Sequence, residues 1–125
     1  MTATATVTPT VTIDCLFCKI RDGQIPAKLV HDDQQCIAIR DLHPQAPTHL
    51  LVIPKTHIAT LNEVTPTHEP LVGHMFTVAA ALARAGGHAE AGWRTVFNVN
   101  RDAGQAVFHI HLHVLAGRQL AWPPG

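Results

Sequence analysis

Residues 108–115 read FHIHLHVL, and apolar residues alternate with histidine over most of this stretch. A period of two is typical of a β-strand with one buried face. The apolar residues from Ile110 to Val114 would point into a core, and the histidines would share the opposite face. These histidines are His109, His111 and His113. Because alternate residues on a strand lie about 7 Å apart, their imidazoles would form a row of hydrogen-bond donors and acceptors.

Two kinds of chemistry fit this row. Neutral imidazole is a common ligand for zinc and similar ions, and it is also a nucleophile and proton carrier near neutral pH. The preceding residues 98–106 (NVNRDAGQA) are turn-rich and bring small side chains directly into the strand. Gly104 and Ala106 leave room for backbone N–H groups to approach an anion such as phosphate. This segment favours nucleophilic chemistry.

The composition indicates one compact domain. The chain has 125 residues, 46% of them hydrophobic, which suffices for a sizeable core. Nine basic and nine acidic residues cancel, so we expect no nucleic-acid or membrane partner and a small anionic ligand instead. The absence of a long apolar run and of a signal-peptide pattern favours a cytoplasmic protein. Residues 1–12 are expected to form a flexible tail before a domain of residues 13–125.

Short periodic segments predict an α+β domain with an antiparallel sheet. The strand patterns cover residues 28–31, 35–40, 49–53, 92–98 and 108–115. A stripe of apolar residues recurs at helical spacing from Leu71 to Leu82, and Gly86 follows as a helix end. A short N-terminal helix is expected over residues 14–23, with Asp14 as its cap. We therefore expect about five strands, one long helix and one short helix.

Cys15 and Cys18 form a Cys-x-x-Cys pair within the expected short helix. Such a pair can be a redox dithiol, half of a zinc site or two small buried residues. A redox role usually needs a thioredoxin-like βαβ context, which is missing, whereas ten histidines could supply the other zinc ligands. Cys36 stands alone in an apolar run and is expected in the core. Three histidines without a partner motif are expected to face solvent: His68, His74 and His88.

Several blocks of sequence resemble the histidine-triad (HIT) family. They are residues 25–28 (IPAK), 41–49 (DLHPQAPTH), 51–57 (LVIPKTH), 104–114 (GQAVFHIHLHV) and 122–125 (WPPG). The blocks occur in family order from Asp14 to Gly125. The PQAPTH and WPPG blocks resemble the Hint branch, the nucleoside phosphoramidases, more than the dinucleoside-polyphosphate hydrolases. The resemblance implies a HIT-like fold that pairs into a homodimer.

The resemblance also implies covalent catalysis. His111 would attack the α-phosphorus of a nucleoside 5′-phosphoramidate and form a nucleotidyl-histidine intermediate, with its other ring nitrogen held by a backbone carbonyl. His113 would hold a phosphate oxygen and help to protonate the leaving group. His49 would orient the row from behind. The implied catalytic histidines are His49, His109, His111 and His113.

A purine nucleotide is the implied ligand. In the family, an aspartate at the position of Asp41 binds the ribose hydroxyls and nearby apolar side chains line the base pocket. Backbone N–H groups of residues 105–107 would stabilise charge on the phosphate, and Asn98 would contact the leaving-group side. The C-terminal end would reach the active site of the partner chain. The nucleotide-binding set is Ile20, Ile39, Asp41, Leu42, Asn98, Gly104, Gln105, Ala106, Val107, His111, His113 and Trp122.

Two features bear on activity. Ala106 stands where the Hint branch normally has serine, a hydroxyl that serves the phosphate and leaving group. Some bacterial HIT proteins carry a similar Cys-x-x-Cys and bind zinc with it. By that resemblance, the zinc ligands are Cys15, Cys18, His57 and His109. The alternatives to a phosphoramidase are a zinc-stabilised purine-nucleotide-binding module with little turnover and a dinucleoside-polyphosphate hydrolase.

Overall fold

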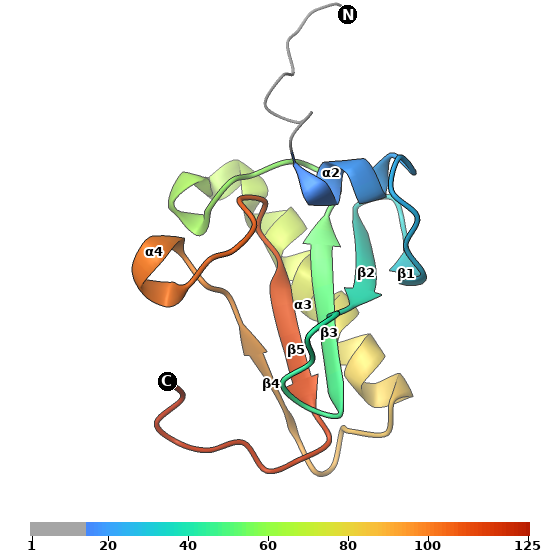
Figure 1. Cartoon of the computed structure of the whole chain (residues 1–125), viewed down its shortest axis with the longest axis vertical. Coiled ribbons are helices and arrows are strands. Elements are labelled where there is room, and N and C mark those ends of the chain that lie inside the picture. The colour runs from blue at the N-terminus through green and yellow to red at the C-terminus, as the bar shows by residue number, and fades with distance from the viewer. Residues whose placement is uncertain (1–14) are drawn as a thin grey trace, which may run out of the picture.

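The computed structural model describes residues 15–125 (Figure 1). The tail expected over residues 1–12 and the cap expected at Asp14 lie outside the described residues. In chain order the elements are α2 (Leu16–Arg21), β1 (Leu29–Asp32), β2 (Cys36–Arg40), β3 (Thr48–Pro54), two 3₁₀ turns (Leu61–Glu63 and Pro66–His68), α3 (Glu69–Ala85), β4 (Trp93–Val96), α4 (Asn100–Ala103) and β5 (Leu112–Ala116).

The five strands form one antiparallel sheet in the order β1-β2-β3-β5-β4. The long helix α3 covers one face, and the short helix α2 packs at one end of the opposite face (Figure 1). This arrangement is the predicted α+β architecture, with one long and one short N-terminal helix. The prediction of fold class is therefore confirmed.

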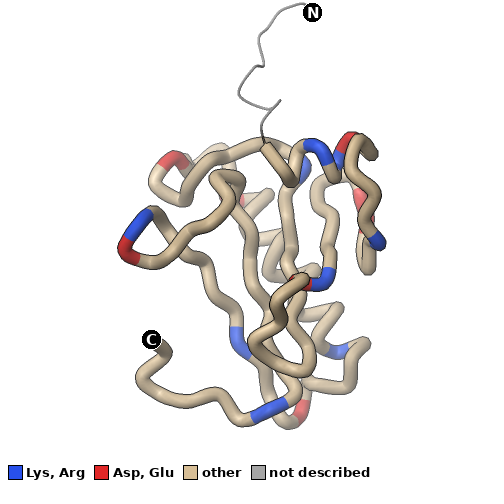
Figure 2. Tube along the Cα trace, in the orientation of Figure 1, with Lys and Arg blue, Asp and Glu red and all other residues tan. Residues whose placement is uncertain are grey.

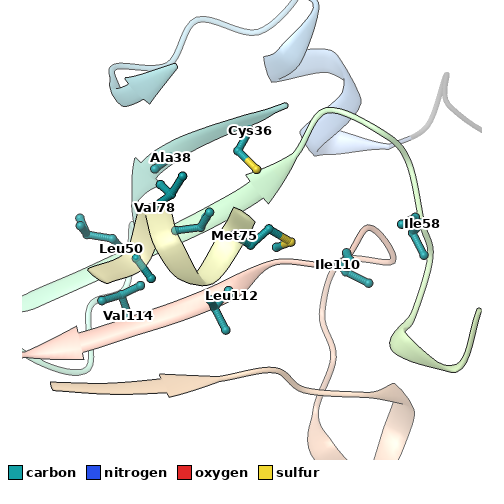
Figure 3. Close-up of a cluster of buried hydrophobic side chains, with 11 residues drawn as sticks. Cys36, Ala38, Leu50, Ile58, Met75, Val78, Ile110, Leu112 and Val114 are labelled. Carbon is teal, nitrogen blue, oxygen red and sulfur yellow. The ribbon is translucent and has the colours of Figure 1, made fainter. Parts of the chain in front are cut away.

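Alternation along the strands divides the apolar side chains between two clusters. Ala38 and Val52 pack with Met75 and Val78 of α3, while neighbouring residues such as Ile53 pack with α2. Figure 3 shows the α3 side of the sheet, where Ile110, Leu112 and Val114 lie in the same cluster. Cys36 also lies there, fully buried, as expected. The apolar half of the alternating stretch therefore points into the core, which leaves the histidines on the α2 side.

The triad strand is shorter than predicted. β5 begins at Leu112, so His109 and His111 precede it, although the alternation of faces continues through them. In the sheet register, Leu112 pairs with Val52 of β3, and two residues further along β3 comes Pro54. Proline has no N–H to donate, and the carbonyl of Pro54 accepts from the His109 ring instead. The ladder ends there, and the Ile110 N–H donates to Ile58 O.

The three histidines expected to face solvent are each partly buried and hydrogen-bonded. His74 Nε2 lies 2.7 Å from the Asp33 carboxylate, which also binds His31, and His88 Nε2 lies 2.9 Å from Thr48 Oγ1. His68 accepts a hydrogen bond from the Thr65 N–H. For His74 and His88 the expectation was wrong because their partners lie about forty residues away in sequence. His68 instead caps its own 3₁₀ turn through the nearby Thr65.

Charged residues of both signs are interspersed over the described chain (Figure 2), in agreement with a net charge of zero. Within residues 15–125 no helix combines the length and apolar character needed to cross a bilayer.

Candidate functional site

The histidine row lies between the sheet and α2. The rings of His111 and His113 are 5.0 Å apart between centroids, and the rings of His109 and His111 both contact Phe17 of α2 edge-on. α2 begins at Leu16 and is capped by Cys15, whose Sγ accepts from the Cys18 N–H. The two cysteines and Phe17 thus sit on the same short turn, directly over the row.

His111 is held as a neutral imidazole with one free nitrogen. Its Nδ1–H donates to the backbone carbonyl of His109 at 2.9 Å, which is the backbone contact that the sequence predicts. Burial lowers the pKa of His111 below that of an exposed histidine. With the proton fixed on Nδ1, Nε2 carries the lone pair, as a nucleophilic imidazole requires.

His113 is oriented by a chain of hydrogen bonds that begins in the backbone. The Gln45 N–H donates to His49 Nδ1 at 3.0 Å, so the proton of His49 is on Nε2. That Nε2–H donates to His113 Nδ1 at 2.8 Å. His113 must therefore carry its own proton on Nε2, where it can be donated to a ligand. His49 thus has the contacts of an orienting residue, whereas no pattern in the sequence pointed to the role of the Gln45 amide.

Asp41 joins this chain to a pocket. Its Oδ2 lies 3.4 Å from His49 Nε2, and its Oδ1 accepts from the His43 N–H at 2.8 Å. A pocket of about 620 Å³ opens beside it, within the usual size range of small-molecule sites. Six of the predicted nucleotide-binding residues line it: Ile20, Ile39, Asp41, Leu42, Ala106 and Val107. Phe17 belongs to the same lining and connects the pocket to His111.

The loop before the row turns sharply at Gly104, whose φ of 76° lies in the left-handed region that favours glycine. The hydrogen bonds of Gln105 differ from the predicted phosphate-binding role. Its N–H donates to Asn100 O, and its side-chain amide binds Asn100 N, Ala59 O and Val107 O. These bonds use every N–H group of Gln105 to hold the loop, so none is left to bind a phosphate. Among the described residues, the N–H groups of Ala106 and Val107 have no protein acceptor.

The other six predicted binding residues do not line this pocket: Asn98, Gly104, Gln105, His111, His113 and Trp122. Asn98 follows β4, and Trp122 is 80% exposed near the C-terminus, where Arg94 donates to Ala121 O. In Figure 1 the C-terminal segment runs past the β4 edge, on the side of the sheet away from β1. A single chain therefore does not bring the tryptophan into the pocket.

The predicted metal ligands converge on one point. Cys15 Sγ lies 3.3 Å and Cys18 Sγ 3.5 Å from His109 Nδ1. His57 Nδ1 lies 3.1 Å from the same nitrogen and 3.3 Å from Cys18 Sγ. A tetrahedron with zinc–sulfur bonds of about 2.3 Å and zinc–nitrogen bonds of about 2.0–2.1 Å has nitrogen–nitrogen and sulfur–nitrogen edges of about 3.3–3.6 Å. The four side chains thus have the spacing of a Cys₂His₂ zinc site.

The chemistry of the donors also fits a cation. His109 Nε2–H donates to Pro54 O at 2.7 Å, so its Nδ1 carries a lone pair that faces three other ligand atoms. That single lone pair can accept only one good hydrogen bond, whereas a metal can bind all four groups. Burial raises the pKa of the Cys18 thiol to about 11 without an ion, so binding would release its proton. The cluster is compatible with zinc.

Comparison with known proteins agrees with this site. A family described as "Scavenger mRNA decapping enzyme C-term binding" matches residues 14–121. The chain is 48% identical to a purine nucleoside phosphoramidase from Escherichia coli, over 86% of this chain and 90% of that protein. It superposes on a HIT family hydrolase from Legionella pneumophila with a TM-score of 0.88 and 55% identity, covering 90% of this chain and all of the other.

A zinc-bound histidine triad family protein from Mycobacterium smegmatis is also similar. It has 38% identity and a TM-score of 0.75, over 86% of this chain and 78% of that chain. The fold, the histidine row and these relatives lead to one assignment. The chain belongs to the histidine-triad family.

Proposed function

We propose that this protein hydrolyses nucleoside 5′-phosphoramidates through a covalent nucleotide–His111 intermediate. The observation that carries the proposal is the Nδ1–H bond from His111 to His109 O, which leaves Nε2 unprotonated. The purine nucleoside phosphoramidase from Escherichia coli supports the substrate class, because nearly half of its aligned residues are identical to those of this chain. The protein is thus an enzyme of the hydrolase type.

In the proposed reaction, His111 Nε2 forms a bond to the α-phosphorus as the phosphorus–nitrogen bond breaks. The nitrogen, protonated from water, leaves as a neutral amine while His113 Nε2–H donates a hydrogen bond at the reacting group. The hydroxide formed from that water then attacks the phosphorus and breaks its bond to His111 Nε2. Over the cycle, the hydroxyl of one water ends on the phosphate and its proton on the amine. No resident cofactor takes part in these steps.

Nucleotide binding follows from the pocket beside the row. The Asp41 carboxylate would accept hydrogen bonds from ribose hydroxyls, and the apolar lining, including Ile20 and Leu42, would contact a purine base. The free N–H groups of Ala106 and Val107 would bind phosphate oxygens. Gly104 would let this loop turn toward the phosphate.

Zinc would have a structural role. Cys15, Cys18, His57 and His109 would hold one ion per chain and fix α2, with Phe17, over the row. Because all four ligands come from the protein, the ion would have no open coordination position for a substrate.

A homodimer completes the proposal, because Trp122 is exposed and does not line the pocket of its own chain. In a dimer, its indole would lie at the leaving-group side of the partner's active site. Sedimentation of the purified protein should give twice the mass of one chain, and a monomer would remove the basis for this placement.

The decisive test is His111→Asn, assayed with adenosine and guanosine 5′-phosphoramidates. Turnover should be lost, while AMP and GMP affinity stays within about tenfold, because only the nucleophile is removed. His68→Asn, on the far 3₁₀ turn, is the matched control and should keep wild-type rates. Substantial turnover by His111→Asn would contradict the covalent mechanism.

A binding module with little turnover is the second candidate. It is favoured by Ala106, which lines the pocket with a methyl group where the family normally offers a hydroxyl. Wild-type protein that binds AMP but hydrolyses none of the phosphoramidates would support this candidate.

A further inference from the structure

The turn after β5 is hydrogen-bonded to the loop between β2 and β3 through Arg118 and Gln45, a contact that we call the clasp. Arg118 donates from Nε and Nη2 to Gln45 O, at 3.1 and 2.8 Å, although the two residues lie 73 positions apart. A guanidinium that donates twice to one carbonyl fixes both the position and the direction of that carbonyl. In Figure 1 this loop crosses over the lower end of β5, close to where the turn begins.

Gly117 makes the close approach possible. Its φ is 98°, and a Cβ at this position would lie 2.9 Å from Pro47 Cβ. Real side chains do not make such a contact, so any other residue here would push the turn away from the loop. The turn therefore meets the loop at two points, Pro47 by packing and Gln45 by hydrogen bonds.

Gln45 is held on both sides of its backbone. Its carbonyl accepts from Arg118, and its N–H donates to His49 Nδ1 at 3.0 Å. That N–H excludes a proton from His49 Nδ1, because two hydrogens would then face each other. The proton of His49 is therefore on Nε2, from which it is donated to His113.

We propose that Arg118 is a positioning residue, which fixes through Gln45 the ring tautomers of His49 and His113 and so keeps a donor on His113 Nε2. Without the clasp, the Gln45 amide moves from His49 Nδ1 and both tautomers of His49 become accessible. In the wrong tautomer, His49 Nε2 accepts a hydrogen bond from His113 Nδ1–H, so His113 Nε2 carries no proton and faces the substrate as an acceptor. The expected effect of Arg118 on turnover rests on the proposed function, whereas its expected effect on the His49 tautomer does not.

The kinetic test compares Arg118→Ala with Arg118→Lys and with Arg84→Ala, an exposed arginine of α3 as matched control. Arg118→Ala should lower kcat for an amine leaving group about tenfold at nearly constant KM, since the ligand contacts remain. The loss should be smaller for a p-nitrophenyl ester of the nucleotide, whose leaving group needs little help. Arg118→Lys, with one donor direction, should be intermediate, and Arg84→Ala should match wild type.

Combination with His49→Ala sharpens this test. Once His49 is absent, Arg118→Ala should cause no further loss, because both act on His113 through the same chain. Equal losses for both leaving groups, or losses that add in the double variant, would show that Arg118 acts only on general stability and would overturn the proposal.

A spectroscopic test needs no turnover. The ¹⁵N shifts of His49 should show an unprotonated Nδ1 and a protonated Nε2 in the wild type and in Arg84→Ala. They should show a mixture of tautomers in Arg118→Ala. A single unchanged tautomer in Arg118→Ala would overturn the inference even if phosphoramidase activity is present. A mixture in a protein that hydrolyses nothing would support it while the proposed function fails.

Discussion

His109 and His113 are four residues apart on the same face, yet their rings have different surroundings. His109 is fully buried, its Nε2–H donates to Pro54 O, and its Nδ1 faces two cysteines and another histidine. His113 is partly exposed, and its Nδ1 accepts from His49, so its Nε2–H remains available. The first ring is arranged to bind a cation and the second to donate to a ligand.

The difference does not come from the basicity of the two rings. Burial lowers the pKa of both to about 4, assisted for His113 by the neighbouring His111 and His49, and opposed for His109 by its bond to Pro54 O. Both are therefore neutral near pH 7. Both rings carry their proton on Nε2, but the partners of the nitrogens differ: the His109 Nε2–H is bound to Pro54 O and its Nδ1 faces the metal-type cluster, whereas His113 Nδ1 accepts from His49 and its Nε2–H remains available. The partners of the two ring nitrogens thus distinguish the proposed metal ligand, His109, from the proposed hydrogen-bond donor, His113.

The largest effect is expected from loss of the proposed zinc ion, which should leave the catalytic histidines in place. Removing zinc with a chelator, or replacing Cys18 by serine, should lower Tm by on the order of 10 °C, because α2 loses its attachment to the sheet. Metal analysis of untreated protein should give about one zinc per chain. Cys36→Ala is the matched control, since it also destabilises a buried position but should keep the zinc. Far less than one equivalent of zinc in untreated protein would leave the cysteines as packing residues.

A smaller effect is expected at the catalytic side. Ala106→Ser should raise turnover of substrates with amine leaving groups by about tenfold, because it supplies a hydroxyl donor beside the pocket. The gain should be smaller for a p-nitrophenyl leaving group. The zinc content and Tm should stay near wild type, which would show that the catalytic side can be changed without affecting the metal side. Unchanged or lower rates on the amine substrates would mean that another donor already serves this position.

The smallest expected effect is on stability against pH. The pKa of His113 is about 4 in the folded protein and about 6.5 in an unfolded chain. Between these values only the unfolded chain binds the proton, so this contribution to the free energy of unfolding is complete above about pH 6.5 and decreases toward pH 4. His113→Asn should therefore lose less stability than wild type between about pH 7 and about pH 4.5, as measured by urea denaturation. Parallel curves for the two proteins would contradict the low pKa.

Local patterns predicted much of the fold. The alternation of residues 108–115 correctly placed Ile110 and Val114 in the core, and the helical stripe from Leu71 to Leu82 packs against the sheet as α3. The strand itself was predicted too long. A period of two describes which face a side chain takes, but the length of a strand also depends on whether the neighbouring backbone can still pair. Pro54 pairs with Cys36 of β2 but has no N–H to donate, and the β3–β5 pairing ends at Val52 and Leu112.

Other parts of the site depend on partners that no local pattern identifies. Gln105 resembles a phosphate-binding residue in sequence, yet its amide contacts Ala59 O, 46 residues away. His74 was expected in solvent but lies against Asp33, whose pKa is held well below its usual range by hydrogen bonds from His31 and His74 despite its burial. Each error comes from a contact between segments far apart in the chain.

The sequence by itself determined the face of each residue in the row, the spacing of Cys15 and Cys18 on one helical turn, and the family to which the chain belongs. Only the tertiary structure decided where the protons lie. Pro54 O fixes the His109 ring, and the Gln45 amide, itself clasped by Arg118, fixes His49. The physical reason is that a local pattern specifies which face of a strand or helix each side chain takes. A tautomer depends instead on which distant atom lies against each ring nitrogen.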